Sequence, residues 1–256
     1  MKKVELRNKK ILVTGGSSGI GLAIAKELKT LGNEVVICGR NQDRLDEAAK
    51  AHGLDTTTGD ISDDDDQVGL MEYMIATHKG LDILVNNAGV MHVYNFANDP
   101  NTLDYLDQEI SLNCNAQLKL TYRALPILKQ SDDPALVFVS SGTAYMPAPL
   151  SLVYTGTKSL IHHFCESLRV QIKPHGIKIF ELLPPPTETG LADTVKSKID
   201  MSQFSFMKAD DVAKALIDGM KADKYEIPVG LSRIIKVASR LAPKLAFRQL
   251  SKTYPE

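Results

Sequence analysis

Short apolar runs alternate along the chain with longer segments in which apolar residues recur at helical spacing. The apolar runs lack alternating polar positions, which predicts strands that are buried on both faces of a sheet. These runs cover residues 11–14, 34–39, 82–87, 135–140 and 177–183. A weaker strand is predicted over 54–60, where threonines favour extended structure.

The helical segments between these strands have recognisable ends. Residues 19–32 carry one apolar stripe, as in an amphipathic helix. Residues 41–53 begin at Asn41, a favourable cap, and end at Gly53. The four aspartates at 63–66 look like an interaction motif, but carboxylates also complement the positive end of a helix dipole. We therefore expect them to form a solvated helix start.

Strands that alternate with helices predict βαβ units with right-handed crossovers. The expected fold class is α/β, with a doubly wound parallel β-sheet and helices on both faces. No linker rich in Pro, Gly or Ser and no internal repeat divides the chain. We expect one domain over residues 1–230, followed by a basic amphipathic extension over 231–256.

Composition narrows the class of protein. Of the 256 residues, 43% are hydrophobic and 24% are charged, which is typical of a globular protein, and the net charge of −1 argues against coating nucleic acid. The three cysteines have no C-x-x-C spacing and the six histidines no zinc-ligand spacing, so neither a disulfide framework nor a metal site is expected. We expect the adjacent His162 and His163 on a helix surface or near a subunit contact.

Nothing in the sequence predicts a signal peptide or a membrane span. The first apolar run is too short for a signal-peptide core, and no run approaches the roughly 18 apolar residues of a spanning helix. We therefore expect a soluble protein. The unpaired cysteines suit a reducing setting, which favours a cytoplasmic location.

A glycine-rich turn follows the first predicted strand and opens the first predicted helix. In "TGGSSGIG", residues 14–21, the glycines Gly15, Gly19 and Gly21 allow a tight turn and close approach of a ligand to the backbone. The unpaired N–H groups at the start of the helix suit a diphosphate. The strand–turn–helix context favours a dinucleotide site over a turn that is merely tight.

The second predicted strand ends without the Asp or Glu that usually binds a free ribose 2′-hydroxyl. Gly39 stands there, and Arg40 follows it. A guanidinium pairs well with a phosphate, so we expect NADP(H) to be preferred over NAD(H). The alternative is that Arg40 is a solvent-facing side chain at a strand end.

Four motifs in register resemble one family, the short-chain dehydrogenases/reductases. They are "TGGSSGIG" at 14–21, "NNAG" at 86–89, "SSG" at 140–142 and "YTGTK" at 154–158. The resemblance extends from about residue 8 to about residue 230. It implies a Rossmann-like catalytic domain that binds NAD(P) and interconverts a ketone or aldehyde with an alcohol. It also implies a homodimer or homotetramer.

The resemblance implies the catalytic roles. Tyr154 is expected to be the general acid that protonates the carbonyl oxygen, and Lys158, one helical turn away, lies on the same face. We expect the ammonium group to lower the pKa of the Tyr154 phenol and to bind the nicotinamide ribose. Ser141 is expected to hydrogen-bond the substrate oxygen. In "SLNCNAQ", Asn113 rather than Asn115 is matched to the asparagine that holds a water in a proton relay to Lys158; the alternative is a surface polar residue.

Other residues are implied to bind the cofactor. Asp60 matches the residue that bonds the adenine amine, with Ile61 beside the ring, although a lone Asp at a strand end is usually a loop cap. Asn87 is implied to brace the sheet near the cofactor. The full implied set is Gly15, Ser17, Ser18, Gly19, Ile20, Gly21, Arg40, Asp60, Ile61, Asn87, Ala88, Gly89, Tyr154, Lys158, Thr187 and Thr189.

The sequence departs from the family pattern after the predicted strand at 177–183. In "LLPPPTETGLA", Pro185 stands where the family has glycine. Successive prolines lack N–H donors and stiffen the segment. The nicotinamide carboxamide is then expected to meet the Thr187 amide, with Thr189 near the cofactor phosphate. The alternative is a rigid surface turn.

Apolar stretches indicate the character of the substrate. Residues 90–96, 144–153 and about 190–208 supply Leu, Met, Phe and Val side chains suited to an adaptable apolar wall. We therefore expect a small carbonyl compound or alcohol that is largely apolar.

The segment 231–256 carries six Lys or Arg residues and one acidic residue, with apolar residues at helical spacing. We expect it to pack on the same domain or on a sister subunit; a basic amphipathic helix can also lie on an anionic membrane surface. This tail resembles that of bacterial family members found near cell-wall D-alanylation genes, which have no established substrate.

Two other functions stay open. One is a catalytically inactive regulator that senses a dinucleotide, and the other is a membrane-surface scaffold that acts through the tail. The chain retains Ser141, Tyr154 and Lys158 together, which favours the enzyme.

Overall fold

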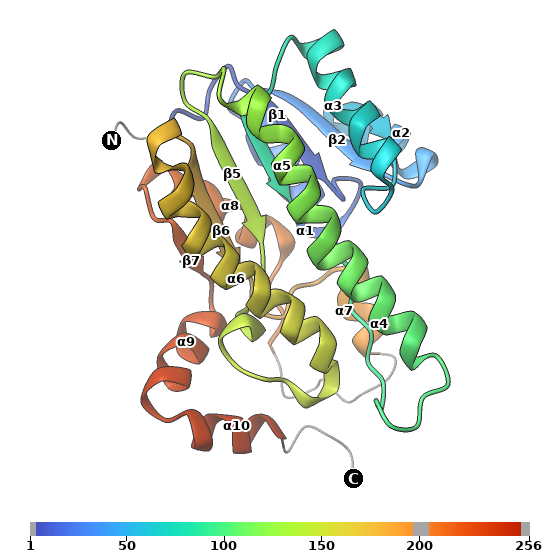
Figure 1. Cartoon of the computed structure of the whole chain (residues 1–256), viewed down its shortest axis with the longest axis vertical. Coiled ribbons are helices and arrows are strands. Elements are labelled where there is room, and N and C mark those ends of the chain that lie inside the picture. The colour runs from blue at the N-terminus through green and yellow to red at the C-terminus, as the bar shows by residue number, and fades with distance from the viewer. Residues whose placement is uncertain (1–3, 197–204, 252–256) are drawn as a thin grey trace.

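The computed structural model describes residues 4–196 and 205–251, and a single parallel sheet forms its centre (Figure 1). The strand order is β3-β2-β1-β4-β5-β6-β7, and each neighbouring pair is parallel. The strands are β1 Lys10–Thr14, β2 Glu34–Gly39, β3 Asp55–Thr58, β4 Ile83–Asn86, β5 Ala135–Val139, β6 Lys178–Leu183 and β7 Glu226–Pro228.

Helices cover both faces of this sheet. Helices α1, α2 and α8 lie on one face, and α3, α5 and α6 lie on the other. The α-helices are α1 Gly19–Thr30, α2 Gln42–His52, α3 Asp64–His78, α4 Thr102–Ile110, α5 Gln117–Leu128, α6 Leu152–Ile172, α7 Gly190–Lys196, α8 Ala209–Lys221, α9 Leu231–Leu241 and α10 Pro243–Ser251. A π-helical segment, Ser111–Ala116, joins α4 to α5, and 3₁₀ turns span Gly142–Tyr145, Pro149–Ser151 and Lys173–His175.

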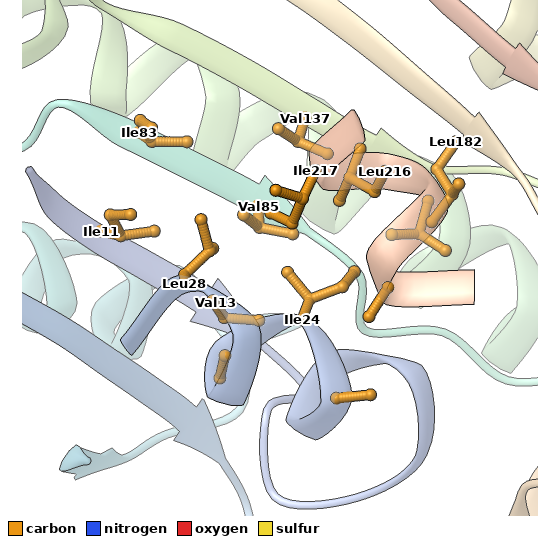
Figure 2. Packing of buried hydrophobic residues seen from close by; sticks show 14 of the residues in the cluster. Ile11, Val13, Ile24, Leu28, Ile83, Val85, Val137, Leu182, Leu216 and Ile217 are labelled. Atoms are coloured by element: carbon orange, nitrogen blue, oxygen red, sulfur yellow. The ribbon is translucent and has the colours of Figure 1, made fainter. Parts of the chain in front are cut away.

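Successive residues of each central strand point to opposite faces, and both faces are buried. Ile11 and Val13 belong to the core beneath α1 and α8, whereas Leu12 belongs to the core on the other face. Figure 2 shows the first of these cores, in which Ile24 of α1 and Leu216 of α8 lie over the strands. This double burial explains the unbroken apolar runs in the sequence. It confirms the predicted fold class, with strand ends within one or two residues of those expected.

The predicted helix ends are also confirmed. The Asn41 side chain accepts a hydrogen bond from the Arg44 amide at 2.9 Å, and Gly53 closes α2 with a φ of 65°. The Asp63 carboxylate caps α3 by accepting hydrogen bonds from the amides of Asp65 and Asp66. The aspartate run is thus a helix start.

The strand order reverses between β1 and β4. From β1 the chain runs outward to β2 and β3, then crosses back to β4 on the other side. Beyond the first turns, the chain that leaves β1 and the chain that leaves β4 run to opposite faces of the sheet. A crevice is expected beyond the carboxyl ends of strands at such a reversal. Ligands of doubly wound sheets bind at such a point.

His162 does not lie on the helix surface, which was one of the two places expected from sequence. It is buried in α6, and its Nδ1 lies 2.8 Å from Oε2 of Glu181, a fully buried residue of β6. The hydrogen bond to Glu181 raises the pKa of His162. His163, its neighbour, is exposed as expected. Burial of a carboxylate in the sheet requires a partner, and His162 supplies it.

Removal of this partner should leave Glu181 buried and unpaired. We expect His162→Leu to lower the free energy of unfolding by about 3 kcal/mol, measured by urea denaturation. His163→Leu is the matched control, and should change stability by less than about 0.5 kcal/mol. Equal effects of the two substitutions would show that the buried pair is not a stabilising contact.

Candidate active site

The loops that follow β1 and β4 are joined by four hydrogen bonds. Thr14 Oγ1 accepts from the amides of Asn87, at 3.0 Å, and Ala88, at 3.1 Å. The Asn87 side-chain amide donates to the carbonyls of Thr14, at 2.9 Å, and Gly15, at 3.1 Å. We refer to these contacts as the Thr14–Asn87 clasp. The resemblance pointed to Asn87 as a brace, whereas the role of Thr14 was not predicted.

The glycine-rich turn lies directly against this clasp. Gly15 has a φ of 62°, and a Cβ added there would lie 2.9 Å from the Cα of Ala88. A Cβ on Gly21 would lie 2.4 Å from the Gly15 carbonyl oxygen. The turn is thus closed to side chains, and the N-terminal amides of α1, which begins at Gly19, follow it. This arrangement fits the diphosphate of a dinucleotide.

The proline-rich segment after β6 reaches the same place. A Cβ on Gly19 would lie 3.1 Å from the methyl carbon of Thr189, so Thr189 lies over the turn. Thr187 is buried, and its hydroxyl donates to the Pro185 carbonyl at 2.8 Å. The structure therefore brings Thr189 to the glycine turn, while the Thr187 hydroxyl serves its own loop.

Arg40 and Asp60 lie at the ends of adjacent strands and pair with each other. Arg40 Nη1 is 3.5 Å from Asp60 Oδ2, and the arginine side chain is 73% exposed. The other Asp60 oxygen accepts from the amide and hydroxyl of Ser62 at 2.9 and 2.6 Å, which is a loop-cap arrangement. Hydrogen bonds from Ser62 and the charge of Arg40 lower the pKa of Asp60 against the effect of burial. Ile61, beside it, is buried in the core.

Ser141, Tyr154 and Lys158 converge where β5 ends and α6 begins. Tyr154 is buried and shares a hydrogen bond with the Ser141 side chain. The Lys158 ammonium lies 5.5 Å from the centre of the Tyr154 ring and donates to the Val139 carbonyl at 2.9 Å. The Ser141 hydroxyl also accepts from the Thr143 amide at 3.2 Å, which orients it at the start of a 3₁₀ turn.

The pKa of Tyr154 is shifted in the direction opposite to the one expected. Burial raises it to about 12, the hydrogen bond from Ser141 opposes this, and the charge of Glu109 adds to it. Burial also lowers the pKa of Lys158 to about 8. The expectation of a lowered tyrosine pKa was wrong because it counted the nearby cation and omitted the loss of solvent around the phenol.

Three polar side chains on one helical face hold the loop after β4. Glu109 Oε1 accepts from the His92 amide at 2.7 Å, Asn113 pairs with both the amide and carbonyl of Val90 at 2.8 Å, and Gln117 donates to the Ala88 carbonyl at 2.9 Å. All three are fully buried. We call Glu109, Asn113 and Gln117 the polar ladder. Their spacing of four residues was a signal in the sequence that motif comparison overlooked.

Asn113 points inward, whereas Asn115 is exposed. It lies in the π-helical segment, a distortion that often occurs at functional sites. Its amide also donates to Thr157 Oγ1 at 3.2 Å, one residue before Lys158. A Cβ on Gly89 would lie 3.0 Å from the Asn113 oxygen and 3.7 Å from the Lys158 ammonium, so these groups surround Gly89.

Glu109 connects the loop after β4 to the start of α6. Its carboxylate accepts from the backbone amides of both His92 and Tyr154, and its Oε2 has no hydrogen-bond partner among the described residues. Burial raises the pKa of Glu109 from 4.5 to about 7, although these two hydrogen bonds oppose the shift. A carboxyl group that titrates near neutrality thus lies beside the candidate proton donor.

The segment after Ser141 is fastened to helix α9. A Cβ on Gly142 would lie 2.3 Å from Ser232 Oγ, and Ser232 is fully buried. The Tyr145 hydroxyl donates to Glu226 of β7, and the Lys236 ammonium donates to the same carboxylate at 2.5 Å. Through these contacts α9 closes one side of the candidate site.

Parts of the expected apolar wall are buried near the site. Val93, Tyr94, Ala144 and Met146 are all buried. Two residues proposed for this wall, Met201 and Phe204, lie outside the described residues. Within residues 4–196 and 205–251, no group of three or more His, Cys, Asp or Glu side chains could hold a metal ion. Among those residues, no helix is long and apolar enough to cross a membrane.

Comparison with known proteins decides the family. A family model described as short chain dehydrogenase matches residues 9–200. The chain belongs to the short-chain dehydrogenase/reductase family. It is therefore an oxidoreductase that acts on CH–OH and C=O groups with a nicotinamide dinucleotide.

Two curated relatives show how the similarity is distributed. "Uncharacterized oxidoreductase DltE" of Bacillus subtilis is 32% identical over 97% of this chain and 98% of its own length. "Very-long-chain 3-oxoacyl-CoA reductase-B" of Danio rerio is 32% identical over 74% of this chain and 63% of its own length. The similarity to the first therefore includes the C-terminal helices.

Two solved structures match this dehydrogenase/reductase closely. A 3-ketoacyl-(acyl-carrier-protein) reductase from Brucella melitensis, complexed with NADH, has a TM-score of 0.77 at 27% identity and covers 86% of this chain and 94% of its own. A short chain dehydrogenase from Burkholderia cenocepacia, in complex with NADP, has a TM-score of 0.83 over 96% of this chain and 98% of its own; at 18% identity it shows the fold alone.

The raised pKa of Glu109 makes stability depend on pH in a defined direction. The folded protein binds the Glu109 proton more tightly than the unfolded chain does, so this contribution is complete below pH 4.5 and is lost as pH rises towards about 7. We expect the loss to be on the order of 3 kcal/mol. Glu109→Gln keeps an acceptor for the His92 amide, and it should remove this dependence of the free energy of unfolding on pH.

Urea unfolding of both proteins at several pH values measures the difference. The subtraction of one curve from the other cancels the remaining titrating groups. Parallel curves between pH 4.5 and about 7 would rule out a raised Glu109 pKa.

Proposed function

We propose that the protein is an NADP(H)-dependent reductase of a ketone or aldehyde carried on a largely apolar molecule. The observation that carries this proposal is the convergence of Ser141, Tyr154 and Lys158 beside the crevice at the sheet reversal. An inactive regulator fits less well, because this member of the family keeps Ser141, Tyr154 and Lys158 together.

The cofactor supplies the hydride when it is bound in the crevice. We propose that its diphosphate lies over the turn formed by Gly15, Ser17, Ser18, Gly19, Ile20 and Gly21, with Thr189 beside it. Asn87, Ala88 and Gly89 form the opposite side, and the clasp fixes the distance between the two sides. Lys158, whose ammonium lies near Gly89, then binds the nicotinamide ribose.

Tyr154 is proposed to donate the proton that the carbonyl oxygen gains. Its pKa of about 12 keeps the phenol protonated at neutral pH, which suits a proton donor. Ser141 donates a hydrogen bond to the same carbonyl oxygen where negative charge develops. Asn113 keeps the loop that bears Gly89 against Lys158. We propose that it also holds a water molecule in a proton relay to Lys158.

The substrate class follows from the surroundings and the relatives. The buried Val93, Tyr94 and Met146 near the site support a substrate with an apolar body. Two similar proteins carry names of 3-oxoacyl thioester reductases, so 3-oxoacyl thioesters are the first compounds to screen.

We also propose a homodimer or homotetramer formed through α5 and α6. Tyr122 of α5 and Val170 of α6 are large and exposed. Helix α5 further carries a shallow hollow of about 420 Å³ lined by Leu118, Lys119, Tyr122 and Arg123, which a second copy could fill.

The role of Tyr154 is tested by a substitution that removes its hydroxyl group. We expect Tyr154→Phe to lower kcat at least about a hundredfold, because the proton donor is lost, while the Kd for NADPH stays within about twofold. Turnover is followed by nicotinamide absorbance on a substrate found by screening, and the Kd by cofactor fluorescence. Retention of the wild-type rate would exclude Tyr154 as the acid.

The preference for NADP(H) is tested at Arg40. We expect Arg40→Ala to weaken NADPH binding about tenfold or more and NADH binding less than about threefold, because a charge-assisted hydrogen bond to the 2′-phosphate is lost. Arg44→Ala, an exposed arginine on the adjacent helix, is the matched control and should change neither affinity. Equal losses for the two cofactors would count against a 2′-phosphate contact.

A further inference from the structure

Helix α9 is oriented against the usual rule for surface helices. Its small and polar side faces the protein: Ser232 is fully buried against Gly142, and Lys236 is paired with Glu226. Its apolar side faces outward, with Ile234 65% and Leu241 81% exposed. A surface helix normally turns its apolar side to the core. The outward stripe of α9 therefore requires another apolar environment.

The stripe continues into α10. Ile234, Val237 and Leu241 recur at helical spacing, and Leu245, 68% exposed, follows beyond the break at Pro243. Figure 1 shows α9 and α10 beyond the carboxyl ends of the strands, at the end of the molecule where α6 begins. The exposed apolar surface is therefore on the same side of the protein as Tyr154.

Charge indicates what covers this surface. Residues 231–251 contain five Lys or Arg residues and no Asp or Glu, in a chain whose net charge is −1. Arg240, Lys244 and Arg248 are exposed and flank the apolar stripe. Two copies that met through the same stripe would bring these like charges together, which opposes a symmetric contact. An anionic lipid surface offers both an apolar layer and the opposite charge.

We propose that α9 and α10 dock on an anionic phospholipid bilayer, with Ile234, Val237, Leu241 and Leu245 inserted at the headgroup boundary. Arg240, Lys244 and Arg248 bind the lipid phosphates. The chain is then a peripheral membrane protein whose active site lies close to the bilayer. The short helices lie on the surface and do not span it.

Vesicle flotation with the full-length protein tests the proposal and requires no catalytic turnover. We expect the wild type to float with vesicles of phosphatidylglycerol and phosphatidylcholine, to float weakly with phosphatidylcholine alone, and to be released by salt. An apolar variant, Ile234→Ser with Leu241→Ser, should reduce the bound fraction at least about fivefold. A charge variant, Arg240→Gln with Lys244→Gln and Arg248→Gln, should reduce it at least about tenfold.

The matched control is Val68→Ser with Ile75→Ser on α3. These side chains are also apolar and exposed, but α3 carries Asp64, Asp65 and Asp66 in its first turn and would be repelled by an anionic surface, so flotation should be unchanged. Circular dichroism melting confirms that each variant is folded. The proposal is overturned if the wild type does not float, or if the apolar variant floats as well as the wild type. It is equally overturned if light scattering shows that the apolar variant only loses a self-association that the wild type has without lipid.

Discussion

The Thr14–Asn87 clasp is the constraint on which the rest of the site depends. The reversal of strand order sends the chain beyond β1 and beyond β4 to opposite faces of the sheet, and four hydrogen bonds hold the turns at the two strand ends together. Buried backbone groups at such a point must find partners. A threonine hydroxyl and an asparagine amide provide them, and the two turns are held in one fixed arrangement.

Buried polar side chains that require hydrogen-bond partners also hold the site in place. The polar ladder holds the loop after β4, and the pair of His162 with Glu181 joins the middle of α6 to β6. Burial of such a group without a partner costs free energy, and a buried group that is paired favours one arrangement of the side chains. The site is therefore rigid where Tyr154 meets Ser141. The same burial keeps the phenol protonated.

The sequence predicted those features that depend on local pattern. Unbroken apolar runs predicted the strands because both faces of the sheet are covered, and Asn41 and Asp63 fulfilled their expected roles at helix starts. The family motifs led to Tyr154 and Lys158, which do converge. Contacts between residues that are distant in the sequence were not predicted. The pairing of His162 with β6 could not be predicted from two adjacent histidines, because Glu181 is far away in the sequence.

The degree of burial of each side chain also could not be predicted from the sequence. A tyrosine one turn from a lysine gives the sign of one electrostatic effect, but the larger effect on Tyr154 comes from the exclusion of solvent by the folded chain. The pairing of Arg40 with Asp60 was missed for a related reason. Each residue was assigned a separate contact with the cofactor, and their strands are neighbours only in the folded sheet.

The contact between Gly142 and Ser232 restricts which residues can be accommodated at these two positions. A side chain at position 142 would overlap the serine, so any residue larger than glycine there demands a smaller residue at position 232 or a displaced helix. A residue larger than serine at position 232 likewise demands a displaced helix, because glycine is already the smallest residue. Position 142 also follows Ser141 directly. A substitution at position 232 of helix α9 can therefore displace the backbone next to the reaction centre, although the two segments are distant in the sequence.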